Sequence, residues 1–308
     1  MNDELRRSSD VQAAISRGLP LVALESSVLA QGLLPPNNRV AAERMMAAVV
    51  QRGAAPAITA IVRGVATLGL EPDELERFLA RDGVRKVSAR DLAHAMASGA
   101  DGATTVAGTL ALCALAGLPV FATGGIGGVH RDAPYDESAD LAELARVQAI
   151  VVCAGAKSIL DLPATLERLE SHGVTVVGYR TNDLPGFFTE KTGIKIDLSV
   201  QSAQEVAAMW HQHRALNRPG SILVVQPPPA AFALEPALVE AATAAALQQS
   251  REQGVRGGAV TPFLLAEVQR RTHGQSVVAN LALLEANAAL AADIAVALTT
   301  SQPKFHAE

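Results

Sequence analysis

The sequence predicts an α/β protein, a three-layer α/β/α sandwich around a largely parallel or mixed sheet. Short apolar runs alternate with longer segments of helical periodicity through most of the 308 residues, which is the rhythm of βαβ units. The chain is 49% hydrophobic but only 3% aromatic, a composition typical of aliphatic strands buried between helices. No internal repeat or domain linker interrupts the rhythm, so we expect residues 1–308 to form one domain.

Short apolar runs mark the expected strands, because their lengths suit strands better than helices. These runs are Leu21–Leu24, Ala57–Val62, Val84–Val87, Val120–Ala122, Ala149–Ala154, Val174–Tyr179 and Ile222–Val225. The segments between and after them have helical periodicity. We expect helices over Arg39–Arg52, Pro72–Arg81, Ala89–Met96, Val106–Ala116, Ser138–Arg146, Ser158–Glu170, Ala203–Leu216, Pro236–Gln253, Pro262–Arg271 and Ser276–Leu298.

Charge and composition exclude several classes of protein. The net charge is −5, and no lysine-rich run or aromatic cluster indicates a nucleic-acid surface, although a small anionic substrate is compatible with this balance. Cys113 and Cys153 lie in apolar segments without CxxC spacing, so we expect buried thiols rather than a disulfide or a zinc site. The polar N-terminus and the lack of an apolar run of about 18 residues predict no signal peptide, no membrane span and a cytoplasmic location.

Lys157 is the first candidate for chemistry, because it follows the apolar run 149–154 and precedes a segment with helical periodicity. Ligands of α/β sheets collect at the carboxyl ends of strands. Partial desolvation and neighbouring cations lower a lysine pKa, and the neutral amine can then attack carbon and form an imine. The alternative is a lysine that lies over apolar surface near a helix start, a position that a helix dipole disfavours for a cation.

Residues 123–131, TGGIGGVHR, form a glycine-rich loop directly after an expected strand. Glycines let backbone amides converge on an anion such as a phosphate, and His130 and Arg131 would add donors beside it. The spacing is not that of a dinucleotide-binding loop. The alternative is a tight turn whose glycines adopt positive φ.

Carboxylates follow this loop at Asp132, Asp136, Glu137 and Asp140. An oxygen-rich cluster suits Mg²⁺ or Mn²⁺, which keep several waters and need one or two carboxylates. The alternative is a solvated loop in which Asp136 or Ser138 caps the next helix.

Three other polar residues lie at positions that suit a site. Glu25 ends an apolar strand and could act as a general acid, or could cap the next segment. Lys86 ends another strand and suits phosphate or ribose contact, although its neighbours Arg90 and Asp91 could form an ordinary surface pair. Asn280, inside the last helix, could reach the site or lie on the helix surface.

These segments together resemble the pseudouridine-5'-phosphate glycosidase family, which includes indigoidine-cluster homologues. The resemblance extends over nearly the whole chain and rests on motifs in the same order. They are ALESSVLAQGLLPPNN from residue 23, KVSARDL from 86, GATTVAGTLALCALAG from 102, FATGGIGGVHR from 121, SADLAEL from 138, VVCAGAKSILDLPATLE from 151, VTVVGYRTNDLPGFFT from 174, VTPFLL from 260 and ANLALLEANAALAA from 279.

The resemblance implies reversible hydrolysis of the C–C glycosidic bond of pseudouridine 5'-phosphate to uracil and ribose 5-phosphate. It makes Glu25 the proton donor and Lys157 the nucleophile, which forms a covalent adduct with the ring-opened sugar. It makes Asp136 the ligand of one Mn²⁺ per subunit, and it implies a homotrimer. The substrate contacts that it implies are Lys86, Val106, Thr123, His130, Ser138, Ala139, Asp140 and Asn280.

Other functions fit the same residues. A Schiff-base aldolase or sugar-phosphate lyase would need the lysine and the phosphate site but no uracil site. A pigment-pathway enzyme would act on another phosphorylated C-glycoside. A regulator that binds a sugar phosphate without turnover would give no reason for an acid, a lysine and a carboxylate cluster to coincide.

Overall fold

The computed structural model describes residues 5–131, 135–257 and 260–300 and confirms the predicted fold class. A central sheet of eleven strands has the order β1-β4-β3-β2-β7-β9-β13-β11-β12, with β6 paired to β3 and β5 paired to β6. Its described pairings are parallel except those of β3 with β4 and β6, so the sheet is mixed. The strands are β1 Leu5–Arg7, β2 Leu21–Glu25, β3 Ala55–Val62, β4 Val65–Leu68, β5 Arg85–Val87, β6 Gly102–Thr104, β7 Val120–Ala122, β9 Ile150–Cys153, β11 Thr175–Tyr179, β12 Ser199–Val200 and β13 Ile222–Val225.

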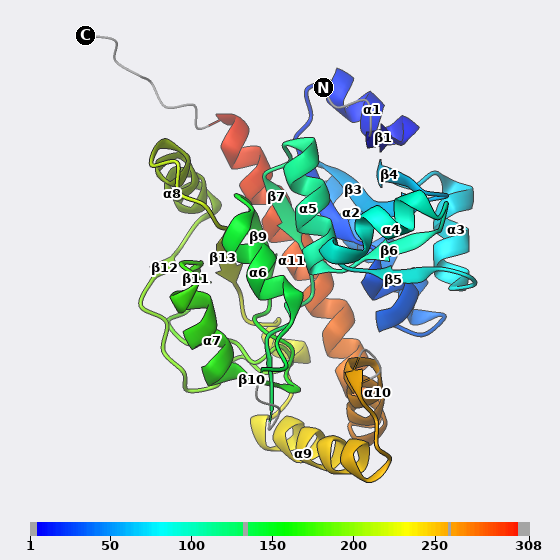
Figure 1. Cartoon of the computed structure of the whole chain (residues 1–308). Helices are drawn as coiled ribbons and strands as arrows, with labels where there is room; N and C mark the ends of the chain where they lie inside the picture. Colours follow the sequence, from blue (N-terminus) through cyan, green and yellow to red (C-terminus); the bar gives the residue numbers. More distant parts are fainter. Residues whose placement is uncertain (1–4, 132–134, 258–259, 301–308) are drawn as a thin grey trace.

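Helices cover both faces of this sheet. Figure 1 shows α2 and α11 against one face and α5, α6 and α7 against the opposite face. Each predicted helix has a counterpart, while α1 and the short strands β1, β4, β6 and β12 were not expected. The α-helices are α1 Ser9–Ser16, α2 Asn37–Gln51, α3 Pro72–Ala80, α4 Leu92–Ala97, α5 Val106–Ala116, α6 Ala139–Arg146, α7 Leu162–Ser171, α8 Ala203–Ala215, α9 Pro236–Glu252, α10 Val260–Arg271 and α11 Gln275–Thr300.

Helix α11 is the central helix of the core. It packs against β2, β7 and β9 and against α2 and α8. By length and hydropathy it could cross a membrane, contrary to the expectation that the chain contains no such run, but 67% of its apolar window is buried. Its apolarity is therefore explained by burial within the fold. Cys113 and Cys153 are buried free thiols, as predicted, and burial raises the pKa of each thiol to about 12.

The predicted helix over Ser158–Glu170 begins too early. Residues Leu160–Asp161 form β10, which pairs antiparallel with β8, Val129–His130. Helix α7 begins only at Leu162, where the Asp161 side chain accepts a hydrogen bond of 3.0 Å from the Ala164 amide. An aspartate at this position is a strong helix N-cap. Lys157 therefore precedes a short strand rather than a helix.

Four buried hydroxyls connect three strands to α5 directly behind the end of β2. Thr104 Oγ1 lies 2.8 Å from Thr59 Oγ1 and 3.0 Å from Thr109 Oγ1. The Thr104 amide donates to Ser26 Oγ at 2.9 Å, and Ser26 Oγ donates to the Thr59 carbonyl at 2.6 Å. All four residues have no solvent exposure. Because buried hydroxyls are costly when unpaired, this cluster favours one mutual arrangement of β2, β3, β6 and α5.

Removing the Thr104 hydroxyl tests the energetic role of this cluster. Thr104→Val should lower the free energy of unfolding by about 1–3 kcal/mol, because it leaves its hydroxyl partners incompletely paired. Thr243 on α9 is the matched control, since it is equally buried but its hydroxyl has no hydrogen-bond partner among the described residues. Thr243→Val should leave stability unchanged or raise it. Urea denaturation of both variants checks this, and equal losses would contradict it.

Candidate active site

Three neighbouring parallel strands bring Glu25, Thr123 and Lys157 to the same edge of the sheet. Strand β7 lies between β2 and β9, with Leu24 opposite Ala122 and Ala122 opposite Val152. Glu25 ends β2, Thr123 follows β7, and Lys157 lies shortly after β9. An isolated bridge between Ile126 and Ala156 continues the alignment beyond the strands. Ligand sites of α/β folds form at this edge.

Glu25 is held by two hydroxyl groups. Its side chain is buried, with 6% exposure. Ser27 Oγ donates to Oε2 at 2.5 Å, and Thr123 Oγ1 donates to Oε1. A buried carboxyl group with a donor on each oxygen has little rotational freedom, so the position of Glu25 depends on these two partners. The alternative that Glu25 caps the following segment explains neither contact.

Lys157 and Lys86 lie near each other and near two carboxylates. The Lys157 amide donates to the Ile126 carbonyl at 3.1 Å, and the half-buried side chain makes no ion pair with any described residue. Lys86, on β5, is exposed on one side. Its pKa is nevertheless lowered, first by burial of the ammonium and then by the charge of Lys157, while Asp140 and Glu25 act in the opposite direction. These four charged groups therefore form one electrostatic cluster.

The glycine loop is shaped by close packing. Three amides of the loop are already hydrogen-bonded within the protein. Ile126 donates to the Gly155 carbonyl at 3.1 Å, Gly127 to Asp140 Oδ2 at 2.8 Å and Val129 to Thr165 Oγ1 at 3.0 Å. These three amides are not available to an anion, so the predicted anion site at this loop lacks three of its donors. None of the loop glycines has positive φ, so the tight-turn alternative is also wrong. A Cβ on Gly127 would lie 2.3 Å from Ser138 Oγ, which explains why this position is a glycine.

Asp140 connects the glycine loop to the start of α5. Its Oδ1 accepts from the Ala107 amide at 2.9 Å, and its Oδ2 accepts from Gly127 at 2.8 Å. Ser138 is the N-cap of α6, as one prediction allowed, and Val106 is the buried first residue of α5. Of the predicted contacts here, Ala139 is exposed on α6 and Asp140 is 5% exposed. Asp140 therefore holds the framework of the site in addition to any contact with substrate.

Asp136 is the carboxylate in this loop that remains open to solvent. Its backbone carbonyl accepts from the His130 amide at 3.0 Å, and its side chain has no partner among the described residues. Glu137 instead pairs with Arg168 at 2.8 Å, and Asp132 lies outside the described residues. Within the described ranges no three His, Cys, Asp or Glu residues form a metal cluster. The donor set therefore fits only an ion that keeps most of its waters, with Asp136 as one ligand.

The other predicted site residues have different surroundings. His130 is half-buried in β8, opposite Leu160 of β10. Asn280 is half-buried on α11, and its Oδ1 lies 3.5 Å from the position that a Cβ of Gly124 would take, so it faces the loop. Arg131 is not a free donor, because it pairs with Glu240 at 2.7 Å. Arg90 and Asp91 form an exposed pair at 3.6 Å, as the surface alternative predicted.

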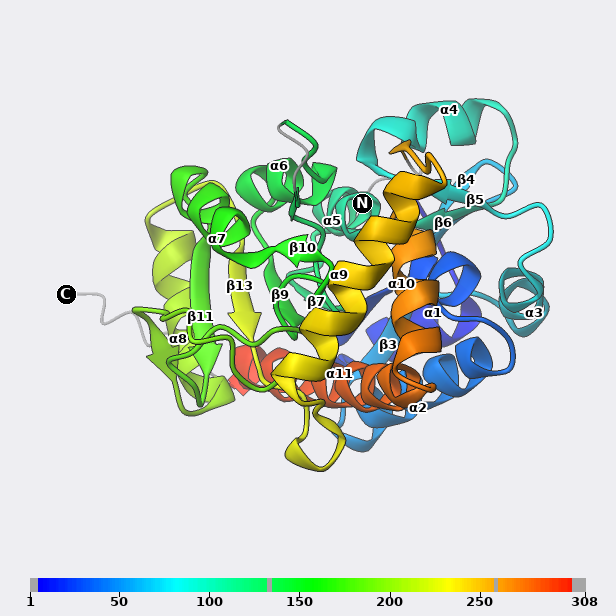
Figure 2. The same ribbon diagram turned by 90° about the horizontal axis from the view of Figure 1, so that it is seen from below.

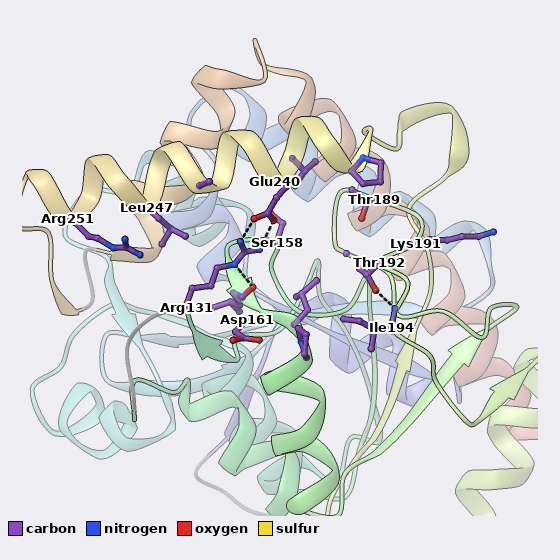
Figure 3. A pocket seen from close by; sticks show the side chains of 17 residues that line it. Arg131, Ser158, Asp161, Thr189, Lys191, Thr192, Ile194, Glu240, Leu247 and Arg251 are labelled. Carbon is purple, nitrogen blue, oxygen red and sulfur yellow. Dashed lines mark hydrogen bonds and ion pairs between the residues drawn. The ribbon is translucent and has the colours of Figure 1, made fainter.

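A cavity of about 730 Å³ has Arg131 and Glu240 among its lining residues (Figure 3). Helix α9 forms one wall of this cavity, and the segment 186–194 forms another. The ion pair between Arg131, at the end of the glycine-rich loop, and Glu240, on α9, joins the loop to this helix. Figure 2 shows α9 and α10 running side by side past the strands. None of Glu25, Lys86, Thr123 or Lys157 lines the cavity, although Ser158 does. The lining of the cavity therefore includes the residue directly after Lys157 but not Lys157 itself.

Sequence reasoning missed two residues that contribute to the geometry. Ser27 holds Glu25, and Asn287 on α11 donates to the Thr123 carbonyl at 2.8 Å. The signals were a hydroxyl two residues after a strand-end glutamate and a second amide within an apolar helix. Neither signal is specific without the fold. The contacts of Thr123 with Glu25 and with Asn287 join residues that are 98 and 164 positions apart in the sequence.

The family model described as "Indigoidine synthase A like protein" matches residues 10–297. A pseudouridine-5'-phosphate glycosidase of Gemmatimonas aurantiaca is 66% identical over 298 residues, 97% of each chain. The enzyme of the same name from Herpetosiphon aurantiacus is 49% identical, over 95% of this chain and 97% of its own. That of Staphylococcus aureus is 45% identical, over 94% and 95%.

Solved structures have the same fold. The prealnumycin C-glycosynthase AlnA, in complex with ribulose 5-phosphate, superposes with a TM-score of 0.89 at 37% identity, over 97% of this chain and 98% of its own. An indigoidine synthase A-like protein from Thermotoga maritima superposes with a TM-score of 0.87 at 33% identity, over 96% of both chains.

A methyl group on Gly127 should disturb both the loop and Asp140. Gly127→Ala should lower the free energy of unfolding by about 1–3 kcal/mol, because its Cβ would overlap Ser138 and approach Asp140 Oδ2 to 2.8 Å. Gly32 is the matched control, since a Cβ there would meet its nearest atom at 3.5 Å and its φ is not positive. Thermal denaturation of both variants checks this. A Gly127→Ala protein as stable as Gly32→Ala would contradict the packing explanation.

Proposed function

The chain belongs to the indigoidine synthase A-like family, and from that premise we propose that it reversibly hydrolyses pseudouridine 5'-phosphate to uracil and ribose 5-phosphate. The observation that carries the proposal is that a half-buried lysine, Lys157, and a buried glutamate held by two hydroxyls, Glu25, lie at the same edge of the sheet. Relatives that carry the glycosidase name match nearly the full length of the chain. The bond cleaved would be the C–C bond between C1' of the ribose and C5 of the base.

A lysine and an acid together suit a base that is linked through carbon. Protonation of a ring nitrogen does not release such a base, so the sugar must be activated instead. Glu25 would protonate the ribose ring oxygen, which breaks the bond from C1' to that oxygen, while the neutral Lys157 amine forms a bond to C1'. The lysine nitrogen then loses a proton and forms a C=N bond to C1'. The electrons of the C1'–C5 bond remain on the base, which takes up a proton at C5. Water hydrolyses the resulting imine, which releases ribose 5-phosphate and restores the amine.

The remaining site residues would bind and orient the substrate. Lys86 is the cation best placed for the phosphate, since it shares the electrostatic cluster with Lys157 and has no ion pair of its own within the described chain. Asn280 and His130 would contact the substrate from α11 and from β8. The aligned β2, β7 and β9 bring the acid and the amine to one end of the sheet, where Glu25 would act on the ring oxygen and Lys157 on C1' of the same ribose. Such positioning is a usual source of rate enhancement.

Asp136 would hold one Mn²⁺ that retains most of its waters. When bound, the ion would orient the pyrimidine and support the charge that develops on it. The carboxylate of Asp136 is exposed and has no partner in the described part of the chain, which supports this assignment. Glu137 and Asp140 have partners elsewhere, which limits the site to a weak, hydrated one. The homotrimer and the cytoplasmic location stay predictions, and light scattering of the purified protein would test the first.

One alternative has specific support. The likeness to a C-glycosynthase bound to ribulose 5-phosphate fits an enzyme that forms or breaks a C–C bond to another aglycone. The identity of 66% to a glycosidase, against 37% to that synthase, favours pseudouridine 5'-phosphate. A Schiff-base aldolase would use the same lysine but would cleave within the sugar, so product analysis separates it.

Uracil release tests the proposed function. The protein with Mn²⁺ should release uracil from pseudouridine 5'-phosphate and not from uridine 5'-phosphate, as measured by chromatography. Lys157→Ala should lower the rate by more than about 10³-fold, because it removes the amine that forms the bond to C1'. Lys191→Ala, at an exposed lysine of the neighbouring cavity, is the control and should keep the wild-type rate. No uracil from either substrate would rule out the glycosidase.

The lowered pKa of Lys86 predicts the pH dependence of substrate binding. Lys86 binds the phosphate while protonated, so KM should rise as the pH increases through its pKa, below the ordinary lysine value of 10.5. We expect KM of the wild type to begin rising below pH 10.5, and KM of Lys86→Arg, which stays charged, to change by less than about threefold over the same range. Ionisation of the base affects both enzymes alike. Parallel KM profiles would contradict this role.

Metal binding tests the role of Asp136. Asp136→Asn should raise the Mn²⁺ concentration for half-maximal uracil release by about tenfold or more, because an amide is a weaker ligand than a carboxylate. Direct Mn²⁺ titration by electron paramagnetic resonance should show the same change. Glu137→Gln is the control, since that carboxylate is paired with Arg168, and it should not change the Mn²⁺ affinity. Unchanged affinity in Asp136→Asn would exclude this residue as the ligand.

A further inference from the structure

Asn287 is a buried amide on the apolar helix α11, 1% exposed, and it is not among the residues that the proposed chemistry uses. Its Nδ2 donates to the Thr123 carbonyl at 2.8 Å and to the Gly124 carbonyl at 3.3 Å. Its Oδ1 accepts from Gln226 Nε2 at 2.9 Å. The side chain therefore joins α11 and the end of β13 to the corner where β7 enters the glycine loop.

Only one orientation of this amide satisfies its surroundings. Two carbonyl oxygens face one end of the Asn287 side chain, so that end must carry the NH₂ group. The other end is then an acceptor, which requires the Gln226 side chain to present its own NH₂ group. In this arrangement both the nitrogen and the oxygen of the Asn287 amide are hydrogen-bonded, as buried amides require. Such a pair allows little rotation of either side chain.

The Thr123–Gly124 corner packs closely against α11. Gly124 allows a close approach, since a Cβ there would lie 3.2 Å from Leu284 and 3.5 Å from Asn280 Oδ1. The Gly124 carbonyl also accepts from the Ala154 amide at 2.9 Å. For the Thr123 carbonyl, the Asn287 amide is the hydrogen-bond donor found in the described part of the chain. Without it, this carbonyl would lie unpaired beside leucines.

We propose that Asn287, supported by Gln226, is a positioning residue that sets the direction of the Thr123 hydroxyl toward Glu25. This inference rests on the proposed function. The relay begins at Gln226, passes through the Asn287 amide to the Thr123 carbonyl, and ends at the hydrogen bond from Thr123 Oγ1 to Glu25 Oε1. Thr123 is one residue beyond β7, so a shift of its peptide changes where its hydroxyl points. Asn287 acts through Thr123 and does not need to contact substrate.

Asn287→Leu tests this role, because leucine keeps a similar volume and removes the donor. We expect kcat for uracil release to fall by about 10- to 100-fold, with KM nearly unchanged, since a misplaced acid affects the chemical step more than binding. Asn38 is a matched control. It is also 1% exposed, and its Nδ2 also donates to two carbonyls, those of Leu29 and Leu79, at 3.0 and 2.9 Å. Asn38→Leu should lower stability and keep kcat within about threefold of wild type.

A double-mutant cycle with Thr123→Val separates positioning from simple loss of stability. If Asn287 acts through the Thr123 hydroxyl, Asn287→Leu should lower kcat by less than about threefold further in the Thr123→Val background. A full multiplicative loss would overturn the inference, as would an unchanged kcat in Asn287→Leu or equal kcat losses in the Asn287 and Asn38 variants.

A gentler variant covers the case in which Asn287→Leu does not fold. Gln226→Met removes only the donor to Asn287 Oδ1, and it should lower kcat less than Asn287→Leu and again non-additively with Thr123→Val. The same cycles measured by urea denaturation report the Asn287–Thr123 coupling whether or not uracil is released. If the denaturation cycles show strong coupling but the wild-type protein releases no uracil, the proposed function alone is overturned. If the free energies of unfolding are additive in these cycles, the relay is overturned.

Discussion

The side-by-side alignment of β2, β7 and β9 is the constraint on which the rest of the site depends. It places a glutamate, a threonine and a lysine, distant in sequence, at one edge of the sheet. Helix α11 packs on all three strands, so the burial of one apolar helix maintains the alignment. The polar contacts at this edge then only have to fix the few residues that lie at or just beyond the strand ends. This division explains how a core of small aliphatic side chains supports a precise polar site.

The polar groups behind the site are neutral hydrogen-bonding groups more often than ion pairs. Hydroxyls hold Glu25, a carboxamide holds the Thr123 peptide, and four hydroxyls join β2, β3 and β6 to α5. Charged pairs with ordinary surface exposure, such as Arg131 with Glu240, lie farther out. Neutral donors fix geometry without adding a net charge, and the charges that act on the Lys86 ammonium are those of Lys157, Asp140 and Glu25.

The fold could be predicted from the sequence because apolar periodicity reports burial directly. The bounds of β7, β13 and α5 were predicted to the residue. The start of α7 was not, because the Asp161 cap and the β8–β10 pairing act locally against a helical pattern. Glu25, Lys157 and Asn280 were recognised as candidates, but the reason for the loop glycines and the role of Asn287 depend on contacts across 11 to 164 residues. Such contacts leave no periodic trace in the sequence.

The central claim is that Lys157 becomes covalently bound to C1' of the ring-opened sugar. The most direct test is to reduce the protein with borohydride during turnover and to locate the adduct by peptide mass spectrometry. The account predicts a reduced pentose-phosphate adduct on Lys157, absent without substrate and absent from Lys157→Ala. An adduct on Lys86 instead, or full turnover with no trapped adduct, would contradict it.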